Sequence, residues 1–151
     1  MSKLSHPNTA LEEPRPFQGM NLINKNAAGI DLGAHEIMVC VSGPGNTQLV
    51  RSFGNYTIDL YAVAKWLREY GVETVAMEST GIYWIPLFEV LETHNFHCLL
   101  ISSRSLRRVP GRKSDVVDAQ WIQTLHTYGL LASSFRPEED LVALRTLLRH
   151  R

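Results

Sequence analysis

The stretch AAGIDLG, residues 27–33, contains a single acid, Asp31, in an otherwise uncharged run. Its apolar residues alternate with Gly and Asp, and this period of two predicts a β-strand. Apolar runs at 37–41 and 48–53 follow, separated by Gly-Pro-Gly-Asn, a strong turn signal. Two such runs around a glycine-rich turn favour an antiparallel hairpin, so the sequence predicts three consecutive strands.

The rest of the sequence alternates helical and extended patterns. The predicted elements are a helix from Thr57 to Gly71, a strand at 73–78, a helix carrying Trp84 to Leu91, a strand at 96–101, a helix from about Ser114 to Tyr128 and a last helix from Pro137. The order βββ-α-β-α-β-α, with an extra C-terminal helix, predicts an α/β fold with a mixed five-stranded sheet. The ribonuclease-H-like fold has this order.

Length and charge limit the possible classes of protein. The 151 residues suit one domain, and the zero formal net charge excludes a globally basic nucleic-acid binder but not a locally basic one. No apolar run approaches the length of a membrane span, so we expect a cytoplasmic protein with no membrane partner. We divide the chain into a flexible arm at 1–25, a catalytic domain at 26–133 and the start of a helical linker at 134–151.

Four acids stand out by position. Asp31 lies inside an apolar strand, where a carboxylate is costly unless it is paired or metal-bound. Its flanking glycines suggest close approach of something large, such as a phosphate, to the backbone. Glu78 ends the strand that we expect beside it. Asp115 and Asp118 are spaced i and i+3, so on one helix they share a face. The sequence predicts that all four converge on one sheet edge.

Converging carboxylates repel one another and raise one another's pKa values. Divalent cations remove this conflict, and hard oxygen ligands suit Mg²⁺ or Mn²⁺, so we expect two ions of the kind that support phosphodiester cleavage. Taken singly, each acid also has a structural explanation: Asp31 ending a strand, Glu78 capping a helix, Asp115 serving a helix N-terminus and Asp118 on a solvated face.

A basic connector precedes the acidic helix. The segment 102–113 has no acid and contains five cations: Arg104, Arg107, Arg108, Arg112 and Lys113. Phosphate recognition explains such a cluster, whereas a merely solvated loop is the plainer alternative. Tyr83 and Trp84 lie shortly after Glu78. Trp84 fits the apolar face of its helix, so Tyr83 is the better candidate for stacking on a base.

With these residues in view, the sequence resembles a family of bacterial insertion-sequence transposases. Three motifs carry the resemblance: Gly29–Gly33, Met77–Trp84 and Lys113–Ala119. It is the DEDD type related to the Piv/MooV DNA invertases, whose amino-terminal domain is similar to the Holliday-junction resolvase RuvC. The family's four acids fall on Asp31, Glu78, Asp115 and Asp118.

The resemblance implies a metal-dependent recombinase that cleaves and transfers DNA strands, with a structured bridge RNA as guide. It also implies a second domain carrying a serine nucleophile, and the absence of a stop signal at Arg151 leads us to expect a chain cut within a longer protein. Two alternatives remain open. One is a sugar-kinase or actin-like ATPase lobe, and the other is a non-catalytic nucleic-acid-binding or dimerisation module.

Two apolar stripes lead us to expect a homodimer or a higher oligomer. The last helix presents Leu141, Leu144 and Leu148 at heptad spacing. The preceding helix presents a second stripe made of Val117, Trp121, Leu125 and Tyr128. We expect both at a subunit interface. The alternative is that they fold back onto the sheet of their own domain.

Overall fold

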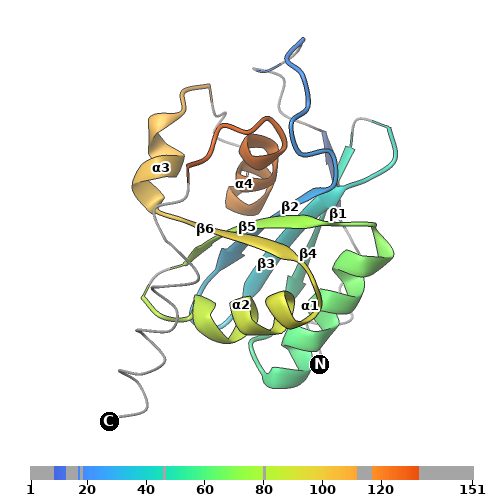
Figure 1. The fold of residues 1–151 in the computed structure, drawn as a ribbon, viewed down its shortest axis with the longest axis vertical. Coiled ribbons are helices and arrows are strands. Elements are labelled where there is room, and N and C mark those ends of the chain that lie inside the picture. The colour runs from blue at the N-terminus through green and yellow to red at the C-terminus, as the bar shows by residue number, and fades with distance from the viewer. Residues whose placement is uncertain are drawn as a thin grey trace.

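The computed structural model describes residues 9–12, 17, 19–45, 47–79, 81–111 and 117–132. These residues form one mixed sheet of six strands with helices on both faces (Figure 1). The strands are β1 (Thr9–Glu12), β2 (Ala27–Leu32), β3 (Ile37–Ser42), β4 (Thr47–Phe53), β5 (Thr74–Ser79) and β6 (His97–Ile101). The helices are α1 (Thr57–Glu69), α2 (Trp84–Thr93), α3 (Ser103–Arg108) and α4 (Asp118–Thr127).

The sheet order is β1-β4-β3-β2-β5-β6. Strands β2, β3 and β4 form the predicted antiparallel meander, while β5 and β6 run parallel to β2. Each parallel strand is reached through a helix, as a parallel connection requires. The mixed α/β class and the alternation of strands with helices are therefore confirmed.

The two faces of the sheet are covered by different helices, as Figure 1 shows. Helices α1 and α2 pack on one face and α4 on the other. The buried apolar residues of β2, Ile30 and Leu32, belong to the core under α1 and α2. Pro86 is the third residue of α2, so it lies in the first turn, where a missing N–H removes no helical hydrogen bond.

The number of strands differs from the prediction. Residues 9–12 form a sixth strand, β1, which pairs antiparallel with β4 at the sheet edge. Leu11 packs there against a small cluster that contains Cys40 and Val50. Residues 9–12, Thr-Ala-Leu-Glu, do not alternate apolar and polar side chains, so the sequence pattern contained no signal for this strand.

Two further elements depart from the predicted pattern. Part of the predicted connector is the short helix α3, whose N-cap Ser102 accepts a hydrogen bond from the Ser105 backbone N–H at 3.2 Å. The next helix begins at Asp118 rather than near Ser114, because Val117 is extended at ψ 156°. An acid in the first turn, such as Asp118, suits the positive end of the helix dipole.

Two of the four residues in the predicted apolar stripe are covered within the chain, whereas Val117 is exposed and Tyr128 is half-buried. Trp121 and Leu125 are buried within the chain, and Phe17 stacks on Trp121 with ring centroids 5.7 Å apart. The expectation of an interface at these two residues was therefore wrong, because a segment far away in the sequence covers them. Leu141, Leu144, Leu148 and the rest of the predicted last helix lie outside the described residues.

Within the described ranges, no helix has both the length and the apolar character needed to cross a membrane.

Candidate functional site

Two of the predicted acids lie side by side on neighbouring strands. β2 and β5 are parallel, and Asp31 is the direct register partner of Glu78. Neighbouring strands are about 4.8 Å apart, and register partners point to the same face of a sheet. Both carboxylates thus occur at the C-terminal ends of their strands, on one face, as the sequence predicted.

Gly29 identifies that face. Gly29 and Asp31 are two residues apart on β2, so they point to the same side of the sheet. A Cβ atom at Gly29 would lie 2.3 Å from the backbone nitrogen of Gln123 and 2.5 Å from the carbonyl oxygen of Ala119. Gly29 therefore allows the backbone of α4 to rest directly on β2. The predicted close approach at this glycine is confirmed, but the group that approaches is the backbone of a helix and not a phosphate.

The third acid comes from the start of α4. Asp118 is the first residue of the helix and is exposed. The carboxylates of Asp118 and Glu78 both raise the pKa of the Asp31 carboxyl, so all three side chains belong to one cluster. The close packing of α4 on Gly29 thus brings Asp118 to the ends of β2 and β5.

The protonation of Asp31 reflects this crowding. Burial is the largest cause that raises its pKa from 3.8 to about 6, and the charges of Asp118 and Glu78 add to the effect. A carboxylate next to two others is disfavoured in its charged form, so part of the Asp31 population carries a proton near neutral pH. Such a raised pKa at a sheet edge is typical of a functional site.

Ser103 adds a polar partner that the sequence pattern did not predict. Its hydroxyl donates a 2.6 Å hydrogen bond to Oε1 of Glu78. Ser103 begins α3 directly after β6, and β6 is the parallel neighbour of β5, so the two strand ends meet. The available signal was its place just beyond a strand parallel to that of Glu78.

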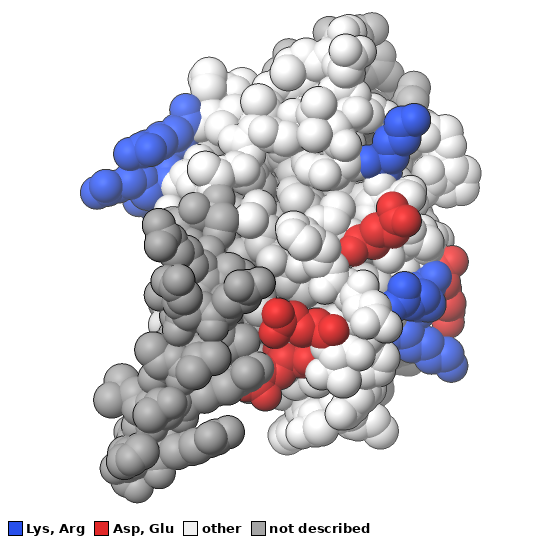
Figure 2. Space-filling view, in the orientation of Figure 1, with Lys and Arg blue, Asp and Glu red and all other residues white. Residues whose placement is uncertain are grey.

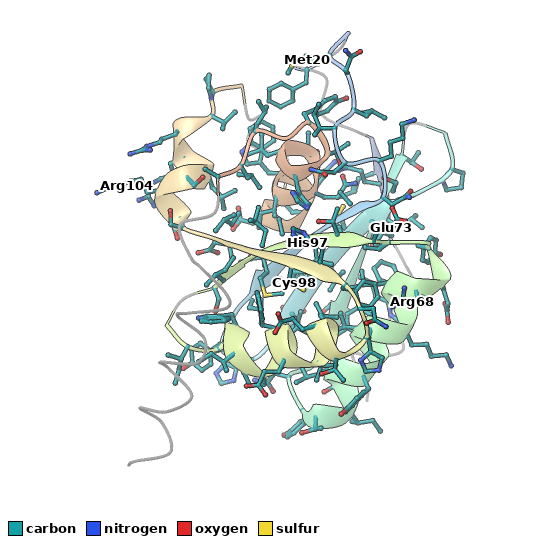
Figure 3. The ribbon with its side chains drawn as sticks, in the orientation of Figure 1. Met20, Arg68, Glu73, His97, Cys98 and Arg104 are labelled. Carbon is teal, nitrogen blue, oxygen red and sulfur yellow. The ribbon has the colours of Figure 1, made fainter. Side chains whose placement is uncertain are left out.

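Helix α3 connects this bond to a basic surface. Arg104, Arg107 and Arg108 are exposed on α3, and Figure 2 shows Lys and Arg side chains gathered at that corner of the molecule. Arg104 extends away from the sheet in Figure 3. Three of the five predicted basic residues therefore belong to a helix whose first residue contacts a site acid.

Three predicted site residues, Asp115, Arg112 and Lys113, lie outside the described residues. The argument that Asp115 and Asp118 share a helix face does not apply to α4, since α4 begins at Asp118. Of the aromatic pair, Trp84 is buried at 4% exposure, as predicted, and Tyr83 is 51% exposed.

The described part of the chain contains no group of three or more His, Cys, Asp or Glu side chains arranged to hold a metal ion. Asp31, Glu78 and Asp118 do form a cluster of acids, but their side chains are not arranged around a common metal position. The chemistry of these side chains nevertheless fits a divalent cation. Carboxylate oxygens are the ligands that Mg²⁺ and Mn²⁺ prefer, and a cation would offset the repulsion that raises the pKa of Asp31.

The comparisons with known proteins point to one family. The family model DEDD_Tnp_IS110, described as a transposase, matches residues 28–151, well over half of the chain. No curated protein matches. A similar solved structure is the ROK hexokinase from Thermus thermophilus, at 19% identity and a TM-score of 0.38. That alignment covers 53% of this chain and 34% of the hexokinase, and so weak a likeness carries no argument about function.

Proposed function

Because the chain belongs to the IS110-type DEDD transposase family, we propose that it supplies the metal-dependent site that cleaves and transfers DNA strands during transposition. The proposed catalytic residues are Asp31, Glu78, Asp115 and Asp118. The approach of Glu78 and Asp118 to Asp31 is the observation that carries this proposal. The strand order β4-β3-β2-β5-β6 supports a ribonuclease-H-like, RuvC-like core with β1 added at its edge.

The acids would act as ligands. Asp31, Glu78 and Asp118, with Asp115, would hold Mg²⁺ or Mn²⁺, in our proposal two ions. When bound, such ions supply activation of an attacking oxygen and neutralisation of a leaving one. A bound cation would favour the carboxylate form of Asp31, the form that can serve as a ligand. Ser103 holds one oxygen of Glu78 in place, so the orientation of that ligand is fixed before DNA arrives.

The basic residues would bind the DNA backbone beside the acids. Arg104, Arg107 and Arg108 offer planar groups suited to phosphate, and the proposal extends to Arg112 and Lys113. The bond between Ser103 and Glu78 puts the start of α3 beside a site acid, which supports a path for the DNA strand along α3 to the acids. In this proposal the arginines would hold the phosphates of the strand, and the carboxylates would hold the metal ions.

The family resemblance extends the proposal to partners. We propose a structured bridge RNA as guide and a homodimer or higher oligomer as the working form, acting in the cytoplasm on chromosomal DNA. A recombinase must hold two DNA segments, which favours more than one subunit.

Calorimetry with Mn²⁺ tests the function on the full chain. We expect Mn²⁺ to bind without nucleotide and to bind more weakly to Asp31→Asn and Asp118→Asn. Glu69→Gln, an exposed carboxylate on α1, is the matched control and should bind as the wild type does. Binding only in the presence of ATP would favour the kinase-like lobe. Absence of binding under either condition would favour the non-catalytic module.

A further inference from the structure

A cavity of about 260 Å³ lies at the C-terminal end of β2, on the face of the sheet that α1 and α2 cover, whereas the acids are on the face that α4 covers. We call it the Tyr83 cavity. It is lined by Leu32, Gly33, Ile37, Asn55, Leu60, Ile82, Tyr83 and Pro86. Leu32 and Gly33 directly follow Asp31 on the chain, while Ile82 and Tyr83 follow Glu78. Residues that follow each of the two acids on the chain therefore line the cavity.

The floor and the rim of the Tyr83 cavity differ. Leu32, Ile37 and Leu60 are between 1% and 6% exposed and form an apolar floor. Ile82 and Tyr83 are 50% and 51% exposed, so apolar surface stays in contact with water at the rim. A buried apolar floor with an exposed aromatic rim is typical of a pocket for a flat, apolar ligand.

The chemistry of the lining excludes a phosphate. None of the eight lining residues is charged, whereas the arginines that suit phosphate are on α3. Asn55 is the polar exception, and its Nδ2 donates to the carbonyl oxygen of Ala34 at 2.5 Å. An Asn side chain has a second N–H and a carbonyl oxygen, which can serve the edge of a base.

We propose that the Tyr83 cavity takes one unstacked nucleobase of the DNA strand whose phosphate lies at the acids. This inference rests on the proposed function of those acids. Asp31 and Leu32 point to opposite faces of the sheet, so the base enters the cavity by turning around the C-terminal ends of β2 and β5. Two residues of extended strand, from Asp31 to Gly33, span about 7 Å, a distance that the base of a neighbouring nucleotide can cover. Tyr83 stacks on the base, and the apolar floor replaces the neighbours that the base loses on leaving the stack.

Single-stranded oligonucleotides test the proposal. The probes are a twelve-residue oligodeoxythymidine and an abasic strand of the same length and charge, with binding to the full chain followed by fluorescence anisotropy in Mn²⁺. We expect the wild type to prefer the strand with bases by about tenfold, the size of one base–aromatic stack. Tyr83→Ala should abolish the preference and leave the affinity for the abasic strand unchanged, while Tyr83→Phe should keep it.

Tyr61 provides a matched control. It is 52% exposed, lies on α1 and is not part of the cavity lining, so Tyr61→Ala should keep the full preference. Equal affinity of the wild type for both strands, or a preference that survives in Tyr83→Ala, would overturn the base pocket. Failure of the proposed function has a different signature, namely no Mn²⁺ binding and no binding of either strand. A change in oligomer mass in Tyr83→Ala, with the preference intact, would assign the cavity to a protein partner instead.

Discussion

Ser103 donates a 2.6 Å hydrogen bond to Glu78, although 25 residues separate them. β5 and β6 are parallel neighbours, Glu78 is in register with Ile101, and Ser103 is two residues further along the chain. The bond ties the first residue of the basic helix α3 to one of the site acids. A partner that fixes a metal-binding carboxylate typically changes metal affinity when it is removed.

Ser103→Ala should therefore weaken Mn²⁺ binding by about tenfold, because Glu78 is no longer held in one orientation. Calorimetry on the full chain measures this change. Ser105→Ala is the matched control. The bond that Ser105 makes to Ser102 uses its backbone N–H, which the substitution keeps. Unchanged Mn²⁺ affinity in Ser103→Ala would show that the bond does not orient Glu78 for metal.

Asp31→Asn should stabilise the metal-free protein at pH 7. The folded pKa of Asp31 is raised to about 6, so between pH 3.8 and 6 the folded state binds more protons than the unfolded state. The free energy of unfolding thus falls as pH rises through that window, and the cost persists at pH 7. We expect a gain of about 1 kcal/mol, less than the shift alone implies because solvent screens this half-exposed group. Urea unfolding in EDTA measures the free energy of unfolding of the metal-free protein. An Asp31→Asn variant that is less stable than the wild type at pH 7 would contradict the argument that the acids repel one another.

His126 should produce the opposite pH dependence. Burial, with a contribution from His97, lowers its pKa from 6.5 to about 4. Below pH 6.5 the unfolded state binds more protons, so this stability is present above pH 6.5 and is lost as pH falls towards 4. His126→Gln should reduce the fall in the free energy of unfolding between pH 7 and 4 by about 2 kcal/mol. His35→Gln, at an exposed position, should leave that fall unchanged. Urea unfolding at several pH values from 7 to 4 measures the difference between the variants. Both variants and the wild type keep Asp31, so its contribution to the pH dependence cancels in the comparison.

Gly29→Ala should destabilise the fold strongly. Its Cβ would meet backbone atoms of α4 at 2.3 and 2.5 Å, and backbone cannot move aside without shifting the helix that carries Asp118. We expect a loss of about 3 kcal/mol. Gly33→Ala, in the same motif, has its nearest neighbour at 3.4 Å and should cost far less. Thermal unfolding of the two variants measures the difference, and equal stabilities would contradict the packing argument.

Removing the α3 arginines should reduce the salt dependence of DNA binding. The slope of log K against log salt on duplex DNA should fall by about 0.9 for each phosphate that the Arg104→Ala/Arg107→Ala/Arg108→Ala variant no longer neutralises. Lys65→Ala removes an exposed cation on α1, on the opposite side of the sheet, and should leave the slope unchanged. A slope that is the same in the triple variant would move the DNA surface away from α3.

Local sequence patterns were enough to predict strands β2 to β6, the placement of Asp31 beside Glu78 and the core position of Trp84. Alternation over six residues and a glycine-rich turn are local signals, and the ends of parallel strands must meet at one edge. These local rules were enough to predict that Asp31 and Glu78 lie side by side and that an acid from a later helix lies near them.

Three features depend on tertiary packing: the residue at which α4 begins, the role of Gly29, and the bond from Ser103 to Glu78. Each depends on packing between segments far apart in the sequence, such as the backbone of α4 resting on β2. The same holds for β1 and for Phe17, which covers Trp121. These short segments show no hydrophobic period, and their place in the fold depends on the apolar surface that the other elements leave exposed.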